Sequence, residues 1–155
     1  MIMSLKTAVL VKKIGISVLF VSLLIGCKGD DDFIGDNPFL IDPLVNINLN
    51  LNLPEYNALN FPGGSVVIPP PQGIKGVVVY NINNSQYVAL EISDPNHTAN
   101  SCSRMTIDGI IASCPCTTDD NKYNIVTGQH QTDETLFPML RYQAIRNGNN
   151  VKVTN

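Results

Sequence analysis

Apolar and asparagine side chains alternate strictly from Val45 to Leu53, in the stretch VNINLNLNL. A period of two residues is typical of a strand that buries one face and leaves the other in water. Immediately afterwards, prolines and glycines recur over residues 54–73 and interrupt the chain too often for a long helix. We therefore expect a strand over residues 45–53, followed by extended segments laid over a β core.

Short strands in antiparallel pairs are predicted for the rest of the chain. The runs Val77 to Ile82 and Tyr87 to Ile92 flank the polar turn NNS, which predicts a hairpin. Further strands are indicated by SRMTID and IIASCP on either side of Gly109, by KYNIV at 122–126, and by the two halves of MLRYQAIRNGNNVKV at 139–153. No segment after the first 26 residues keeps a helical period over three turns, so the sequence predicts an all-β domain of stacked antiparallel sheets.

The beginning of the chain has the layout of a secretory signal peptide. Three lysines precede an apolar run from Ile14 to Ile25, and this run is shorter than the roughly 20 apolar residues that a membrane-spanning helix needs. We therefore predict that residues 1–26 are a signal peptide.

The end of this leader, Leu24 to Cys27, resembles the lipobox of bacterial lipoproteins. The resemblance implies that Cys27 is acylated and becomes the first residue of the mature chain, anchored in a membrane by its acyl chains. The following KGDDD resembles the surface-export signal of lipoproteins in the Bacteroidetes. We expect a protein of the outer membrane or cell surface, with a flexible tether over residues 27–37 and a single domain over residues 38–155.

Charge restricts the class of partner. The chain has ten basic and thirteen acidic residues, and loss of the three lysines of the leader would leave seven against thirteen, a net charge of −6. A chain with this balance has no electrostatic reason to bind nucleic acid. The sequence does not indicate which protein or small molecule would be its partner.

The segment SCPCTTDDNKYNIVTG, residues 113–128, carries the candidate chemistry. It resembles the second cluster loop of Rieske domains, in which two cysteines bind one iron and two histidines bind the other iron of a [2Fe–2S] cluster. Cys114, Pro115, Tyr123 and Gly128 stand in matching places, and DPNHTANSCSRM at 94–105 is similar to the first loop. The resemblance covers residues 73–153 and implies a Rieske-like fold.

Most ligand positions of that family hold other residues in this chain. Asp94 and Asn96 stand where the first loop has cysteine and histidine, Thr117 stands where the second loop has histidine, and Cys114 alone is a ligand type that matches. His97 lies one residue out of register, and along an extended segment such a shift turns a side chain to the opposite face. The resemblance therefore implies a variant without a cluster, and we expect no cofactor and no metal.

The remaining cysteines have two interpretations. In the respiratory subgroup of the Rieske family, the second cysteine of Cys-Pro-Cys pairs with a cysteine at the end of the first loop, which implies a Cys102–Cys116 disulfide here; Cys114 in place of Cys116 stays open. An oxidising compartment favours such a bridge. The alternative is a non-standard metal or [2Fe–2S] site built from His97, Cys102, Cys114 and Cys116, because zinc and iron accept nitrogen and sulfur donors.

Other chemistry is absent from the sequence. The turn at Asp119, Asp120 and Asn121 has calcium-binding residue types, but these residues also favour turns for backbone reasons. No phosphate-binding glycine loop and no nucleophile elbow is present, so we expect no enzyme. The function expected from the sequence is a membrane-anchored binding or structural module; the alternative is an electron-transfer protein with a non-standard iron–sulfur or metal site.

Overall fold

The computed structural model describes residues 37–155, so the predicted signal peptide, Cys27 and all but the end of the predicted tether lie outside the described residues. The elements of the described part are β1 Asn46–Asn50, η2 Pro54–Asn60, β2 Ser65–Ile68, β3 Val77–Asn81, β4 Tyr87–Glu91, β5 Thr106–Asp108, β6 Ile111–Ser113, β7 Lys122–Asn124, β8 Arg141–Asn147 and β9 Asn150–Thr154. For the described residues, the prediction of an all-β fold of antiparallel sheets without long helices is confirmed.

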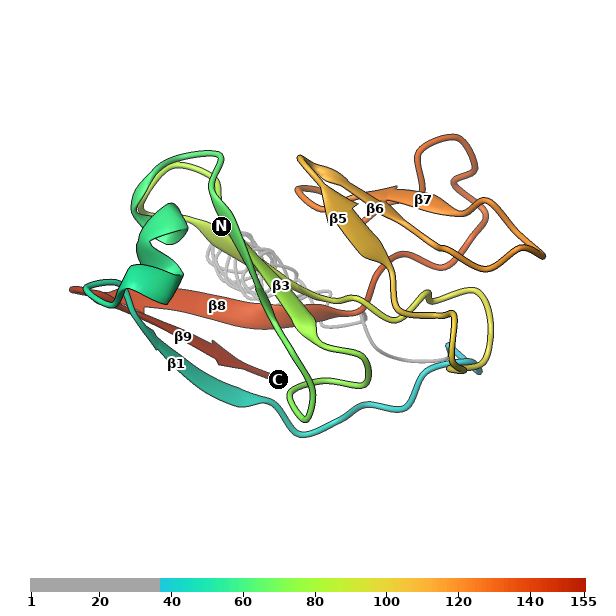
Figure 1. The fold of residues 1–155 in the computed structure, drawn as a ribbon, viewed down its shortest axis with the longest axis horizontal. Helices are drawn as coiled ribbons and strands as arrows, with labels where there is room; N and C mark the ends of the chain where they lie inside the picture. Colours follow the sequence, from blue (N-terminus) through green and yellow to red (C-terminus); the bar gives the residue numbers. More distant parts are fainter. Residues whose placement is uncertain (1–36) are drawn as a thin grey trace, which may run out of the picture. The chain divides into compact units, whose positions relative to one another are not determined.

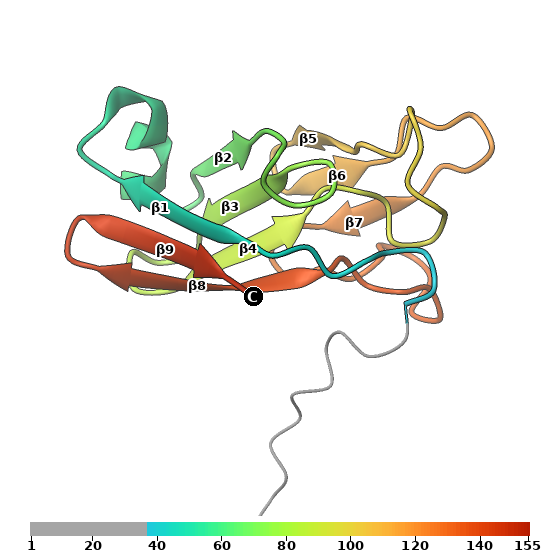
Figure 2. The same ribbon diagram turned by 90° about the horizontal axis from the view of Figure 1, so that it is seen from below.

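The strands form two sheets, and every pair is antiparallel. One sheet has six strands in the order β1-β9-β8-β4-β3-β2, and the other has three in the order β5-β6-β7 (Figures 1 and 2). Strand β8 joins two halves of the larger sheet, because its first two residues pair with β4 and its other five pair with β9. The larger sheet therefore consists of a β1-β9-β8 half and a β4-β3-β2 half, and a hydrophobic core lies between them.

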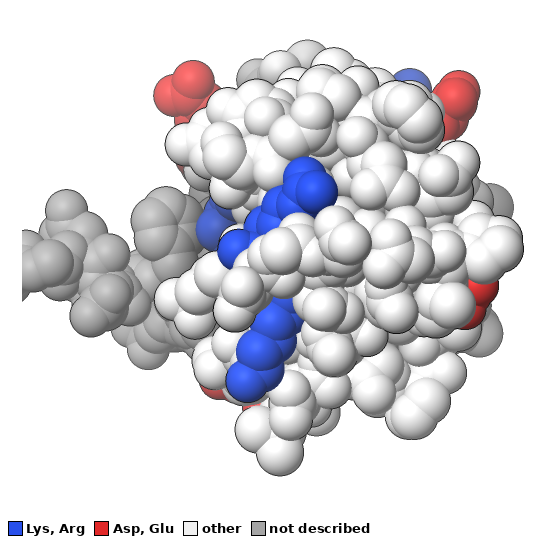
Figure 3. Space-filling view, turned by 90° about the vertical axis from the view of Figure 1, so that its left-hand side faces the viewer, with Lys and Arg blue, Asp and Glu red and all other residues white. Residues whose placement is uncertain are grey.

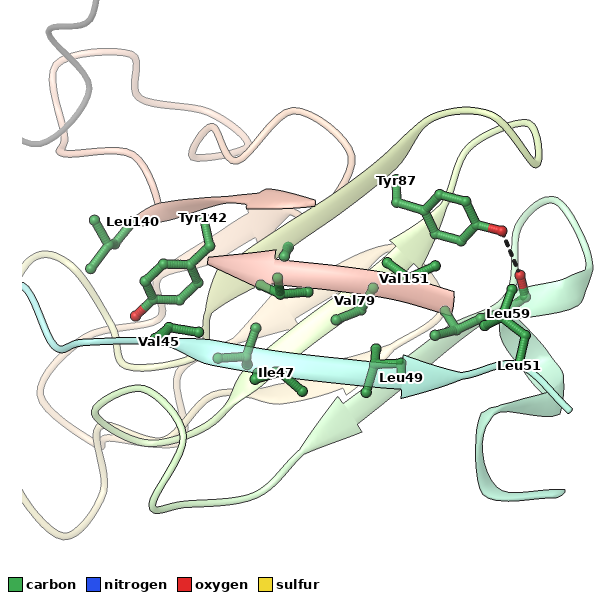
Figure 4. Close-up of a cluster of buried hydrophobic side chains, with 13 residues drawn as sticks. Val45, Ile47, Leu49, Leu51, Leu59, Val79, Tyr87, Leu140, Tyr142 and Val151 are labelled. Atoms are coloured by element: carbon green, nitrogen blue, oxygen red, sulfur yellow. Dashed lines mark hydrogen bonds between the residues drawn. The ribbon is translucent and has the colours of Figure 1, made fainter. Parts of the chain in front are cut away.

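This first core is filled mainly by aliphatic side chains. Its buried members are Val45, Ile47, Leu49, Leu51, Leu59, Val77, Val79, Tyr87, Ala89, Leu140, Tyr142, Val151 and Val153 (Figure 4). The hydroxyl of Tyr87 donates to the Leu59 carbonyl at 3.0 Å, so the polar end of this ring is satisfied at the edge of the core. Along β1, Ile47 and Leu49 are buried whereas Asn46 and Asn48 are exposed, as the alternation predicts.

The second core lies between the other face of β3 and β4 and the three-stranded sheet. Its buried members are Val78, Val88, Leu90, Ile92, Met105, Ala112, Cys114, Cys116, Tyr123, Ile125 and Met139. Strands β3 and β4 therefore face a core on each side, and all five residues of β4 are buried. A strand covered on both faces needs no polar alternation, which explains the continuous apolar runs at residues 77–79 and 87–90.

The predicted hairpins are present, and one helix was missed. Strands β3 and β4 pair as predicted, as do β5 with β6 and β8 with β9. Residues 54–60, expected to be extended, form a short 3-10 helix in which Pro54 takes the first helical position, where a missing N–H costs nothing. Among the described residues, no helix is long and apolar enough to cross a membrane.

The two ends of the molecule carry different elements and loops. The end that carries η2 and the β8–β9 turn presents mostly uncharged side chains, with a narrow group of basic residues and a few acidic ones near the rim (Figure 3). The loop after β4 and the loop after β6 lie together at the opposite end (Figures 1 and 2). These two loops contain the candidate site residues of the sequence.

Candidate metal centre

Two loops approach each other at the end of the second core. One follows β4 and the other connects β6 with β7, and each is closed at its base by a backbone hydrogen bond: Asp94 N–H to the Ser103 carbonyl and Cys114 N–H to the Asn121 carbonyl, both at 2.9 Å. These bonds fix where the loops leave the sheets. The side chains between them therefore have defined positions.

Four potential metal donors converge between the loops. His97 Nε2 lies 3.4 Å from Cys114 Sγ, 3.5 Å from Cys116 Sγ and 3.7 Å from Asp119 Oδ2. All four donor atoms lie within 4.8 Å of one another. This combination of one nitrogen, two sulfurs and one carboxylate oxygen is a donor set that zinc or iron accepts.

His97 faces the centre, contrary to the expectation from the sequence. The alternation rule applies to extended backbone, whereas Pro95 and Asn96 form a turn that brings His97 round toward Cys114. The ring Nδ1 lies 3.1 Å from the Thr98 carbonyl oxygen, so Nδ1 carries the proton and donates it there. Nε2 then presents its lone pair to the other donors, which is the orientation that metal-binding histidines have.

Two carboxylates flank the histidine. Asp119 Oδ1 is buried and has no hydrogen-bond partner among the described residues, so it is free to accept from a water molecule or to contact a cation. Asp94 is fully buried and well satisfied: Oδ1 accepts from Asn96 N–H at 2.8 Å and from the Tyr123 hydroxyl at 3.1 Å, and Oδ2 accepts from Asn121 Nδ2 at 3.1 Å. Asp94 Oδ2 also lies 3.7 Å from His97 Nε2. Asp94 thus supplies a fixed negative charge beside the donors.

The thiol of Cys114 responds to this environment. Its pKa is raised from 9.0 to about 12, mainly by burial and also by the neighbouring carboxylates of Asp94 and Asp119, whereas a hydrogen bond from the Cys116 backbone opposes this shift. Without a cation the group is therefore a neutral thiol. A bound metal ion would reverse this balance, because a coordinated thiol loses its proton.

The other cysteines are also close to the centre. The sulfurs of Cys102 and Cys116 lie 2.05 Å apart, a disulfide distance, with their Cα atoms 5.1 Å apart. Cys114 is the free cysteine of the described residues, so the structure has the Cys102–Cys116 pairing rather than one through Cys114. Cys116 therefore belongs both to this pair and to the donor group.

The four positions that the resemblance to Rieske domains assigned to cluster ligands lie in different environments. Asp94 and Cys114 lie at the centre. Asn96 connects the first loop to the segment before β8, since Nδ2 donates to the Tyr123 hydroxyl at 2.8 Å and to the Phe137 carbonyl at 2.9 Å. Thr117 is exposed and lies outside the donor group.

The prediction of no cofactor is contradicted by the convergence of these metal-capable side chains. The structure gathers the metal-capable group His97, Cys114, Cys116 and Asp119, in which Cys116 can act as a ligand only when it is not bridged to Cys102. The alternative donor set from the sequence had Cys102 in place of Asp119. The sequence does not single out the carboxylate of Asp119, because aspartate is an ordinary residue in a turn. The spacing Cys-x-Cys-x2-Asp from Cys114 to Asp119 is the sequence feature that indicates this ligand.

The donor group fits one metal ion better than a two-iron cluster. Metal–ligand bonds of about 2.0–2.3 Å in a tetrahedron place ligand atoms roughly 3.3–3.8 Å apart. The distances from His97 Nε2, 3.4 to 3.7 Å, have this size, and all four donor atoms lie within 4.8 Å of one another. A [2Fe–2S] cluster distributes its ligands over two irons, so its four ligand atoms cannot all gather within one such tetrahedron. The residues present therefore do not fit that cluster.

No family model matches this chain, and no curated protein matches it. Solved structures with a similar fold include the ferredoxin of carbazole 1,9a-dioxygenase from Nocardioides aromaticivorans IC177 (14% identity, TM-score 0.44, covering 73% of this chain and 98% of that one). Another is a complex of reduced oxygenase and oxidised ferredoxin in carbazole 1,9a-dioxygenase (23% identity, TM-score 0.43, covering 63% of this chain and 86% of that one). A third is a small subunit of a putative NADH-dependent nitrite reductase from Mycobacterium tuberculosis (17% identity, TM-score 0.43, covering 74% of this chain and 97% of that one). At these values no conclusion about the site is taken from them.

Proposed function

We propose that this domain binds a single divalent transition-metal ion between its two loops and serves as a metal-dependent electron-transfer module of the cell envelope. The observation that carries the proposal is the convergence of His97 Nε2, Cys114 Sγ and Asp119 Oδ2 around one point. Three protein ligands leave the fourth position of a tetrahedral ion open. When an ion such as iron is bound, it supplies one-electron chemistry, and the protein fixes its coordination and its surroundings.

A purely structural ion is the weaker role for this centre. The two loops are already held by the Cys102–Cys116 pair, by the backbone bonds at their bases, and by the contacts of Asn96 with Phe137. An ion is therefore not needed to fasten them, unlike the zinc of small domains that unfold without metal. The side chains of His97 and Asp119 are 21% and 23% exposed, so an ion held by them would lie near the surface, where a partner can exchange electrons.

A proton would compete with the metal ion for His97 Nε2. Two carboxylates stand 3.7 Å from His97 Nε2, and a protonated imidazole would pair with both of them. An ion bound by His97 Nε2, Cys114 Sγ and Asp119 Oδ2 would use all three donor atoms, whereas a proton binds to the nitrogen alone.

The envelope location is part of the proposal. The leader and Cys27 would hold the domain to the outer membrane or the cell surface. Cysteines at disulfide distance suit that oxidising compartment. The proposal gives the domain no catalytic role of its own.

The two histidines of the chain, His97 and His130, allow a matched test. The full chain carrying Cys27→Ser, purified in detergent, is titrated with Co²⁺ and with Zn²⁺. His97→Gln should weaken binding by about 100-fold or more, because a ligand atom is lost. His130→Gln should bind as the parent does, since His130 lies outside the donor group and accepts bonds from Thr132 and Asp133. One ion per chain is expected; equal binding by the two variants, or no binding by the parent, would overturn the proposal.

A further inference from the structure

Cys116 Sγ has two roles that exclude each other. It lies 2.05 Å from Cys102 Sγ, and it also lies 3.5 Å from His97 Nε2 within the donor group. Thiolates are the metal-ligating form of cysteine, whereas a sulfur in a disulfide has no negative charge to donate. With the pair bridged, the centre has three strong ligands; with the pair open, it has four.

We propose that the Cys102–Cys116 pair is a redox switch that adds or removes the fourth ligand of the metal site. The inference rests on the proposed metal binding and goes beyond it, because it assigns a regulation to that site. Reduction delivers Cys116 to the metal and closes its coordination. Oxidation withdraws Cys116 and reopens the fourth position.

The difference in burial between the two cysteine residues favours one direction of attack. Cys116 is 5% exposed, whereas Cys102 is only partly buried and follows the exposed Ser101. An external dithiol can therefore reach the sulfur of Cys102 first. Attack of its thiolate on Cys102 breaks the protein disulfide, forms a mixed disulfide with Cys102 and expels Cys116 as a thiolate. The thiolate is released beside His97, where the metal is proposed to lie.

The electrons and protons balance with a dithiol as the reductant. The second thiol of the dithiol attacks the mixed disulfide, frees Cys102 as a thiol and leaves the dithiol oxidised to a disulfide. In total, two electrons and two protons pass from the dithiol to Cys102 and Cys116. Cys116 then gives its proton to solvent when its sulfur binds the metal.

The loop is built to keep its shape when the bridge opens. Asn100 Oδ1 accepts from the backbone N–H groups of Cys102 and Ser103 at 2.9 and 3.0 Å, and Ser103 Oγ accepts from Asn100 N–H at 3.0 Å. These bonds hold the end of the first loop independently of the disulfide. The second loop keeps the bond between Cys114 N–H and the Asn121 carbonyl. Cys116 can therefore change partner without a rearrangement of its surroundings.

Two variants reproduce the two states without any reductant. In the full chain with Cys27→Ser, Cys102→Ser leaves Cys114 and Cys116 as free thiols, whereas Cys102→Ser/Cys116→Ser leaves Cys114 alone. Co²⁺ is the probe, because the intensity of its sulfur-to-cobalt charge-transfer band counts the bound thiolates. The single variant should bind Co²⁺ at least about tenfold more tightly than the double variant, with about twice the band intensity. Thermal unfolding of both metal-free variants verifies that each is folded.

The outcomes separate the switch from the metal site. Equal affinity and equal band intensity in the two variants would overturn the switch and leave the proposed metal binding standing. No cobalt binding by either folded variant would overturn the proposed function, and the switch with it. The unmodified pair provides the second measurement: addition of a dithiol to the cobalt-loaded parent should double the charge-transfer band, and an unchanged band contradicts the switch.

Discussion

Two carboxylates, one beside each core, differ in how their oxygens are satisfied. Glu91, next to the first core, accepts four hydrogen bonds: Oε2 from Ile74 N–H at 2.7 Å and the Tyr142 hydroxyl at 2.9 Å, and Oε1 from Lys75 N–H at 2.8 Å and Ser93 N–H at 3.0 Å. Asp119, next to the second core, has a buried oxygen with no partner among the described residues. A carboxylate that is fully satisfied holds a fold together, whereas an unsatisfied one among other donors indicates a ligand.

The cores themselves differ in the same way. The first core ends in aliphatic and tyrosine side chains whose polar groups have partners, such as Tyr87 with the Leu59 carbonyl. The second core ends in Cys114 and Cys116, which face His97. Stability and metal chemistry should therefore respond to different substitutions.

The largest effect is expected from Glu91→Ala. The substitution leaves three backbone N–H groups and the Tyr142 hydroxyl without their acceptor, and each loss costs roughly 1–3 kcal/mol. We expect the free energy of unfolding to fall by about 4 kcal/mol or more, measured by urea denaturation of the metal-free chain. Metal affinity of the folded fraction should be unchanged. A loss below about 1 kcal/mol would show that this carboxylate does not hold the fold.

The converse pattern is expected from Cys114→Ala. Loss of the thiolate should weaken Zn²⁺ binding about 100-fold, equivalent to about 2.7 kcal/mol, in a calorimetric titration. The free energy of unfolding of the metal-free chain should fall by much less than this loss of binding free energy, because Cys114 is a small residue at the end of the second core. Met105→Leu, a swap of similar volume in the same core, is the control and should leave Zn²⁺ binding unchanged. Normal Zn²⁺ binding by Cys114→Ala would contradict the assignment.

High pH should destabilise both cores by a smaller amount. Burial raises the pKa of Tyr142 in the first core and of Tyr123 in the second above the ordinary 10.0, and nearby carboxylates add to the shift. The folded chain therefore keeps protons that the unfolded chain loses above pH 10. Stability is fully present below that pH and should fall above it by about 1.4 kcal/mol per pH unit for each tyrosine.

The slope of the free energy of unfolding against pH reports the ionisation of the tyrosines, whereas a hydrogen bond lost in a substitution changes the free energy equally at each pH. Tyr142→Phe and Tyr123→Phe should each reduce the slope by one group in the metal-free chain, whatever they do to the stability at neutral pH. Urea denaturation at a series of pH values between 8 and about 11 measures it. A slope that neither substitution changes would mean that these rings ionise in the folded state as they do in the unfolded state.

The smallest effects are expected from the neighbouring aspartates of the second loop. Asp119→Asn should weaken metal binding about tenfold, because an amide oxygen is a neutral and poorer ligand than a carboxylate. Its effect on the stability of the metal-free chain should stay within about 0.5 kcal/mol, since Oδ1 has no hydrogen bond to lose. Asp120→Asn, at the exposed neighbouring residue, should change neither quantity. Equal metal affinities of the two variants would remove Asp119 from the site.

Much of the fold could be predicted from local pattern. The alternation around Ile47 and Leu49 specified a half-buried strand, and polar turns specified the hairpins. The pattern around Pro54 does not predict the helix η2, because a proline interrupts most helices, although it can also begin one. That β3 and β4 form the middle layer depends on which strands lie beside them, and this was not visible in either strand alone.

The site was harder to predict because its donors come from two loops. The sequence indicates His97, Cys114 and Cys116 as candidates. The two-residue period of a strand, which predicts that His97 points away from the site, does not hold there because His97 follows a turn. Asp119 looked like an ordinary turn residue, because its unsatisfied oxygen and its distance to His97 exist only in three dimensions. A chelating set from separate loops is defined by distances, and residue spacing specifies such distances only within one loop.

The most direct test of the central claim is native mass spectrometry of the protein after export to an oxidising compartment and purification without chelator. The account predicts a mass that exceeds that of the protein by a single transition-metal ion, together with the loss of two hydrogens for one disulfide. His97→Gln should lose the ion and keep the disulfide. A parent protein that retains its fold and its disulfide but carries no ion, even after addition of Zn²⁺, would contradict the claim that these loops form a metal site.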